Sequence, residues 1–289
     1  MHFPRIPGAA GRFGVVITSA LASGTLLVGP AAAATASTAP VLIYNYQFKG
    51  ATGTVPNSAT GGPVAPLTLT GTWSDSTNGV RFHGNLTGDE SVGYAKPATG
   101  YTLNASASQA VGFGAQIVYK PPAGATCFTT TPNITQIGKY SAKTPSAQAK
   151  IQESGCGTSK SKVMIQCRFS GSKSAPSAGS VTNKLPLVSG DTYNVSCVKS
   201  PDSTTGTATI TLTVTNLKTS KTLTNHFTVP AIGAMKTTEY LSVGNKYPMA
   251  PPASNFDQFN GAMNSTVYCV GTQDAVSTCL SAVLSPVRG

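Results

Sequence analysis

The sequence predicts an all-β protein in which two antiparallel sheets pack face to face as a jelly-roll sandwich. Apolar and polar residues alternate with a period of two in many segments, which is typical of strands with one buried and one solvated face. No long window repeats apolar residues at the three- and four-residue spacing of a helix. Segments rich in Gly, Pro, Ser and Asn separate the alternating stretches and supply the turns.

The clearest strand covers residues 207–215, where Thr occupies every odd position and an apolar residue every even one. Threonine is β-branched and polar, so it suits the solvated face of a strand. After a turn at 218–221, the return strand places Leu223, Phe227 and Val229 on its buried face. The stretch 57–72 is rich in Gly, Pro and Thr but does not interrupt the domain. The other predicted strands are residues 41–48, 80–83, 111–119, 134–140, 148–153, 162–169, 192–198, 240–243 and 259–268.

The first 36 residues are interpreted as a secretory signal peptide. Arg5 and Arg12 give a positive N-terminal region, and residues 13–28 are apolar without a charge. Small residues at and before Ala34 and Ala36 fit the cleavage rule, and the apolar segment is too short for a membrane span, which needs about 20 residues. We therefore expect a secreted, extracellular protein without a membrane span, with a sandwich domain at 37–270 and a tail at 271–289.

All six cysteines follow the predicted signal peptide. An even number in this context indicates disulfides, although six cysteines allow 15 pairings. Cys167 and Cys197 each lie on the apolar face of a predicted strand, so they could bridge two strands. Cys269 and Cys279 are close enough in sequence to fix the tail. None has the C-x-x-C spacing of a zinc or redox site, so all six are interpreted as structural. The remaining pair is then Cys127 with Cys156.

Charged residues make up only 10% of the chain, and the formal net charge is +11. Such a surface attracts anionic polymers and, at minimum, favours solubility. No basic cluster carries the interleaved aromatic residues of a nucleic-acid surface, so we expect no nucleic-acid partner.

The order of short motifs between residues 41 and 270 resembles the concanavalin A-like, laminin-G-type (LamG) jelly-roll family. The motifs are YNYQF at 44–48, GVRFHG at 79–84, GFGAQIV at 112–118, SGDTYNV at 189–195, TLTVTN at 211–216, and LSVGN with FNGAM between 241 and 263. The resemblance implies that Gly261 lets the chain turn tightly into the closing strand, a task suited to glycine. Where the family's closing strand carries an acidic residue, this chain has Asn264. The Ala-rich leader resembles those of bacterial, in particular actinobacterial, proteins.

Some members of the family bind calcium through loop carboxylates and carbonyls, and calcium takes several oxygen ligands. Only Asp89 and Glu90 are adjacent among the acidic residues after the leader, and a solvated turn is the simpler interpretation of this pair. Asp257, in a Pro-rich loop, is the next candidate. We expect no cofactor, with calcium at these three residues as the alternative.

The sequence contains none of the catalytic motifs that enzymes of this fold use. Glycoside cleavage normally needs two carboxylates about 5 to 9 Å apart, and sandwich glucanases carry them as Glu-x-Asp-x-x-Glu, which is absent here. Lyases of this fold cluster Arg, Gln, His and Tyr. Arg81 and His83, on either side of Phe82, come nearest, and a solvent-facing pair is the simpler interpretation. The chain also lacks the G-x-S-x-G nucleophile elbow, so we expect no catalytic residues and no enzyme activity.

Binding is the main functional expectation. Trp73 is the single tryptophan, and tryptophan is highly buried on average, so it is interpreted as a core residue. Tyr101 and Tyr247 are candidate exposed aromatics for sugar stacking. We expect a binding or adhesion protein for a glycan or anionic cell-envelope polymer, with Tyr101, Tyr247, Arg81 and His83 as candidate contacts. The alternatives are a structural protein without a ligand and a diverged polysaccharide hydrolase or lyase.

Overall fold

Two antiparallel sheets of eight strands each, here called sheet A and sheet B, form the core of the protein and confirm the predicted jelly-roll sandwich. The computed structural model describes residues 41–59, 65–83, 91–97, 99–120, 131–139, 144–154, 162–173, 179–247 and 257–284. All of these residues belong to one unit, Ser37–Gly289. Within the described ranges, no helix reaches the length and apolarity that a bilayer crossing requires.

Sheet A contains the strands β8, β14, β15 and β18, which are ten or eleven residues long. Its order is β15, β14, β13, β8, β18, β5 and β4, and β1 also pairs with β18. The bounds are β1 Val41–Gln47, β4 Trp73–Ser76, β5 Gly79–Phe82, β8 Ala110–Tyr119, β13 Thr192–Lys199, β14 Thr207–Asn216, β15 Lys221–Pro230 and β18 Gly261–Gly271.

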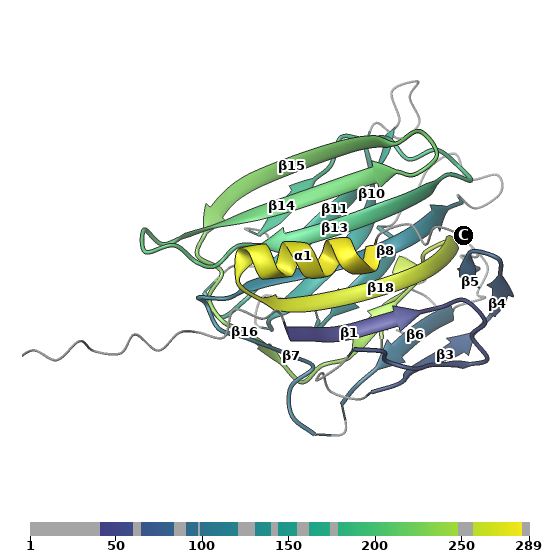
Figure 1. Ribbon diagram of the computed structural model, residues 1–289, viewed down its shortest axis with the longest axis horizontal. Coiled ribbons are helices and arrows are strands. Elements are labelled where there is room, and N and C mark those ends of the chain that lie inside the picture. The colour runs from purple at the N-terminus through teal and green to yellow at the C-terminus, as the bar shows by residue number, and fades with distance from the viewer. Residues whose placement is uncertain are drawn as a thin grey trace, which may run out of the picture. The chain divides into compact units, whose positions relative to one another are not determined.

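Sheet B packs behind sheet A, with β10 and β11 behind β13 and β14 in Figure 1. Its order is β12, β11, β10, β9, β17, β6, β3 and β2. The bounds are β2 Thr54–Val55, β3 Leu67–Gly71, β6 Ser91–Ala95, β9 Asn133–Ile137, β10 Ser146–Ser154, β11 Lys162–Ser170, β12 Ser180–Thr182 and β17 Leu241–Val243. A small separate sheet pairs β7, Leu103–Ala105, with β16, Met235–Thr237.

The core between the sheets is aromatic and is crosslinked. The centroid of the Phe113 ring of β8 lies 5.3 Å from that of Phe169 on β11 and 5.3 Å from that of Tyr268 on β18. The disulfide between Cys167 of β11 and Cys197 of β13 joins the two sheets covalently, as predicted. Aromatic burial supplies much of the favourable free energy of such a core.

The helix α1, Gln273–Leu284, lies across the outer face of sheet A (Figure 1). Its buried residues Val276, Leu280 and Leu284 repeat every four positions and so form one stripe. This stripe packs close to β8 because Gly112 and Gly114 have no side chain. A Cβ atom at Gly112 would lie 2.3 Å from Val276 Cγ1, and one at Gly114 would lie 2.6 Å from Leu284 Cδ1.

The predicted disulfide between Cys269 of β18 and Cys279 of α1 fixes this helix to the sheet. The sequence did not predict the helix, which lies in the segment 271–289 that was expected to be a tail. With only 12 residues, its apolar stripe is too short to stand out as a periodic pattern.

Other details of the fold differ from the prediction or refine it. Strand β3 lies within 57–72, where the sequence predicted no strand. Phe227 was expected on a buried face but is 56% exposed, because its strand β15 forms the edge of sheet A. Trp73 is half-buried against the core. Cys127 and Cys156 lie outside the described residues.

The closing segment has no room for a side chain at Gly261. Gly261 has a φ of 150°, and a Cβ atom there would lie 2.2 Å from the Val118 carbonyl oxygen. A side chain is therefore excluded at the point where β18 enters sheet A.

Candidate functional site

The outer face of sheet B, which points away from sheet A, is polar. On strand β10, alternate side chains point to the core and to the outer face. Ala147, Ala149 and Ile151 lie in the core between the sheets, so Gln148 and Lys150 project from the opposite face. The same alternation on β11 places Arg168 on the outer face, because Cys167 and Phe169 lie in the core.

Strand register places polar residues from five strands side by side on this face. Tyr94 of β6 lies beside Ser242 of β17, and Ser242 lies beside Gln136 of β9. Gln136 lies beside Gln148 of β10, which in turn lies beside Arg168 of β11. Two residues along β10 from Gln148, Lys150 lies in a second row, between Asn133 of β9 and Gln166 of β11. We call these eight residues the sheet B polar face.

Amide hydrogen bonds hold the centre of the face in place. The Gln148 amide nitrogen donates to Gln136 Oε1 at 2.8 Å and also to Asn133 Oδ1. The Asn133 amide donates to the same Gln136 oxygen at 3.2 Å. Arg168 Nε donates to Gln166 Oε1 at 2.7 Å, which orients the guanidinium group on the face. A network of this kind fixes the direction of the polar groups.

Several oxygens on β10 are buried without a hydrogen-bond partner. They are Ser146 Oγ, Gln148 Oε1 and Gln152 Oε1, and none has a donor within reach in the described structure. All three residues alternate along the outer face together with Lys150. Buried polar atoms are nearly always hydrogen-bonded, so this unpartnered line indicates places for buried water.

The charge of the face is positive. Lys150 is only 6% exposed, and its ammonium donates to Thr131 Oγ1 at 2.9 Å. Burial lowers the pKa of Lys150 to about 8; Arg168 and Lys246 also lower it, and Asp257 opposes them. The neighbours of Lys150 therefore add positive charge, which favours an anionic ligand.

Three tyrosines lie together at the β6 end of the face. The Tyr247 ring stacks on the Tyr94 ring with centroids 3.8 Å apart, and Tyr240 meets Tyr247 edge to face at 4.6 Å. Lys96 Nζ lies 5.2 Å from the centre of the Tyr240 ring. Burial, followed by the hydrogen bond and charge of Tyr94 and the charge of Tyr240, raises the pKa of Tyr247, so its hydroxyl stays neutral at physiological pH.

The structure brings only some of the predicted residues to this face. Tyr247 belongs to the tyrosine cluster, where it is half-buried and stacks on Tyr94 rather than standing fully exposed. Asp257 pairs with Lys246, whose ammonium contacts the Asp257 carboxylate. Asp89 and Glu90 lie outside the described residues. Among those described, no group of three or more His, Cys, Asp or Glu side chains is placed to hold a metal ion.

The other predicted contacts lie elsewhere. Arg81 lies in β5 of sheet A, and His83 directly follows this strand. Both side chains are half-buried, whereas the sequence predicted that they face solvent. His83 Nε2 lies 3.0 Å from Ser74 Oγ, which gives the imidazole a structural partner. Tyr101 is 48% exposed and precedes β7 in the small separate sheet.

Sequence reasoning missed the residues at the centre of the polar face. The available signal was the alternation Gln148-x-Lys150-x-Gln152 on one predicted strand and Gln166-x-Arg168 on the next. The solvated face of the 207–215 strand carries Thr alone.

No protein-family model and no curated protein matches this sequence. The chain is similar in fold to the binding domain of botulinum neurotoxin serotype D/C VPI 5993, at 8% identity and a TM-score of 0.46 over 84% of this chain and 52% of that one. It is also similar to lectin II from Ulex europaeus, at 12% identity and a TM-score of 0.39 over 71% of this chain and 92% of that one. A third similar structure is the basic winged bean lectin with Tn-antigen, at 10% identity and a TM-score of 0.43 over 80% and 98% of the two chains. The chain spans about half the length of the neurotoxin binding domains that it matches, and the likeness concerns the fold alone.

Proposed function

We propose that this protein binds a polysaccharide whose sugars carry carboxylates, and that the sheet B polar face is its binding surface. The observation that carries the proposal is the Arg168 guanidinium, which Gln166 orients on the outer face of sheet B and which is only half-buried. Tyr94, at the other end of the row, is half-buried as well. The amide side chains between them are buried and hold the row in place.

The carboxylate preference follows from the cations of the face. Arg168 presents a planar guanidinium that can hold a carboxylate with two parallel hydrogen bonds. Lys150 lies one level away, on the neighbouring strand β10. The formal net charge of +11 adds a long-range attraction for an anionic polymer.

The tyrosine cluster supports a sugar ligand rather than a small anion. Aromatic rings offer an apolar face, and a hydroxyl at the wet end, to the ring of a sugar. Tyr94 is both a member of the polar row and the stacking partner of Tyr247. A polymer that lies along the row can therefore meet the cations at one end and the aromatic rings at the other.

Calorimetric titration with hexameric oligogalacturonate at low ionic strength tests this proposal. Because a hydrogen bond to a charged group contributes about 1.5–3 kcal/mol, Arg168→Met should weaken binding by roughly tenfold to a hundredfold. Lys221→Met, an exposed cation of β15 in sheet A, is the matched control and should change affinity less than about twofold. No binding at millimolar concentration, or equal losses in the two variants, contradicts the proposal.

The remaining parts of the proposal concern context. We propose that the protein is exported by the leader at 1–36, acts outside the cell without catalysis, and belongs to the LamG-type branch of the jelly-roll sandwiches. The motif order between 41 and 270 supports the last point, and the apolar leader supports the first. Retention of the leader in protein recovered from culture medium would count against export by this route.

A second candidate function is polysaccharide elimination, which the position of Lys150 next to Arg168 on the neighbouring strand favours, since Arg168 can hold the uronate carboxylate. An amine with its pKa lowered to about 8 is partly neutral near physiological pH and can act as a base. Lys150 would take the proton next to the uronate carboxylate as the adjacent C4–O bond breaks, and the departing oxygen would take a proton from water. The product carries a new C=C bond. A rise in its ultraviolet absorbance that Lys150→Met abolishes would favour this reaction over binding alone.

A further inference from the structure

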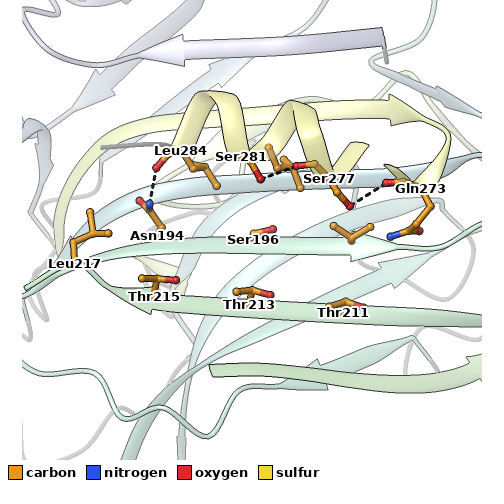
Figure 2. Close-up of a pocket in the computed structure, with 12 residues that line it drawn as sticks. Asn194, Ser196, Thr211, Thr213, Thr215, Leu217, Gln273, Ser277, Ser281 and Leu284 are labelled. Atoms are coloured by element: carbon orange, nitrogen blue, oxygen red, sulfur yellow. Dashed lines mark hydrogen bonds between the residues drawn. The ribbon is translucent and has the colours of Figure 1, made fainter. Parts of the chain in front are cut away.

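A groove lies between α1 and the strands β13 and β14, on the outer face of sheet A (Figure 2). Its volume is about 480 Å³, which is within the range of small-molecule sites. Thr211, Thr213 and Thr215 of β14 line one wall, and Ser277 and Ser281 of α1 line the other. Figure 2 shows the helix alongside the strands, with Gln273 at one end of the groove and Leu284 at the other. Sheet A separates this groove from the sheet B polar face.

Both walls of the groove are held in fixed positions. The Thr213 hydroxyl lies 3.0 Å from the Thr224 hydroxyl of β15, which restricts its rotation. On the helix wall, the Cys269–Cys279 disulfide anchors α1 at its middle. The Asn194 amide of β13 donates to the Leu284 carbonyl at 2.5 Å, which holds the C-terminal end of the helix. A groove that is already ordered loses little conformational entropy when it binds a ligand.

The lining of the groove is uncharged. Every described residue that lines it has a hydroxyl, amide or aliphatic side chain, and none of these side chains ionises near neutral pH. Aliphatic parts come from Val198, Leu217, Leu280 and Leu284, and hydroxyls come from the serines and threonines. The Ser277 and Ser281 hydroxyls donate to helix carbonyls, so they offer a ligand acceptor oxygens. This mixture matches a ring that presents C–H groups on its faces and hydroxyls at its edge, whereas a carboxylate or phosphate would find no cation.

One polar atom in the groove lacks a partner. Gln273 lines the groove, and its Oε1 is buried without a hydrogen bond from any described residue. Such an acceptor is costly to bury unless a donor reaches it. A ligand hydroxyl could supply that donor if the half-buried Gln273 side chain turned its amide oxygen toward the groove.

We propose that this groove is a second binding site, which takes an uncharged linear oligosaccharide. The three threonines of β14 span about 14 Å, and the twelve-residue helix spans about 18 Å, so the groove accommodates a short stretch of a polymer. The site differs from the proposed function in both position and ligand charge. The protein would then hold a neutral chain on sheet A and an acidic chain on sheet B.

The experiment is a calorimetric titration with four neutral hexasaccharides: cellohexaose, maltohexaose, xylohexaose and chitohexaose. At least one should bind at millimolar concentration or better. Thr213→Trp places an indole in the groove and should weaken that binding by roughly tenfold or more. Thr209→Trp, on the same strand and face but outside the groove, is the matched control and should leave affinity within about twofold. Thr213→Val, which keeps the shape of threonine, replaces the indole variant if circular dichroism shows misfolding.

Arg168→Met separates this inference from the proposed function. It should leave neutral-sugar binding unchanged, whereas Thr213→Trp should leave oligogalacturonate binding unchanged. The inference is overturned if no neutral hexasaccharide binds. It is also overturned if Thr213→Trp and Thr209→Trp bind alike, or if Arg168→Met abolishes neutral binding. The proposed function fails on separate grounds, namely the absence of oligogalacturonate binding.

Discussion

Replacement of Gly112 by alanine tests how α1 is held on sheet A. The new Cβ atom would lie 2.3 Å from Val276 Cγ1 and 2.9 Å from Leu280 Cδ1. Non-bonded carbon atoms prefer a separation of about 3.5–4.0 Å, so the helix or the strand must shift. Overpacking of this kind costs about 1–3 kcal/mol. The free energy of unfolding should fall by that amount in urea titrations followed by circular dichroism, with both described disulfides intact.

A double-mutant cycle identifies the cause. Val276 is fully buried, so Val276→Ala alone should destabilise the protein through the cavity that it leaves. In the Gly112→Ala/Val276→Ala protein the new methyl group enters that cavity. The double variant should therefore be more stable than the sum of the single changes by about 0.5–3 kcal/mol. If the two single-variant losses in unfolding free energy add to within about 0.5 kcal/mol, the new methyl group does not compete with Val276 for space. That result would refute the reasoning.

Three further predictions follow from the site and the core. The pKa of Lys150 falls from 10.5 to about 8 on folding, so folding releases a proton between these values, and stability should rise with pH across that interval. Urea titrations at several pH values should show this rise in the wild type, and a rise of equal size in Lys150→Met would contradict it. The double change Cys167→Ala/Cys197→Ala opens a crosslink across 30 residues and should lower the free energy of unfolding by about 3–4 kcal/mol; a loss below about 1 kcal/mol would count against a stabilising bridge. Arg81→Met should leave oligogalacturonate affinity within about twofold, since Arg81 belongs to sheet A. A tenfold loss of affinity would show instead that Arg81 contributes to binding.

Local patterns in the sequence predicted much of the fold. Strict alternation of Thr with apolar residues marks β14 at 207–216, and the apolar faces of β11 and β13 correctly paired Cys167 with Cys197. These signals are local, because the side-chain period of a strand is independent of its neighbours. Short strands such as β7 and β16, with three residues each, carry too few positions to show a period.

The candidate site depends on information that is not local. Gln136, Gln148 and Arg168 are distant in sequence and become neighbours only through the register of β9, β10 and β11. The burial of Lys150 depends in the same way on packing, and its lowered pKa follows from that burial. Tyr247 could be predicted as a candidate contact because it lies in a Pro-rich loop, but its stacking on Tyr94 could not.

Amide chemical shifts of the labelled protein during titration with hexameric oligogalacturonate test the central claim most directly. The account predicts shift changes concentrated on β9, β10 and β11, around Gln136, Lys150 and Arg168, with little change on β14 and β15. Shift changes confined to sheet A, or no change at saturating oligosaccharide, would contradict it.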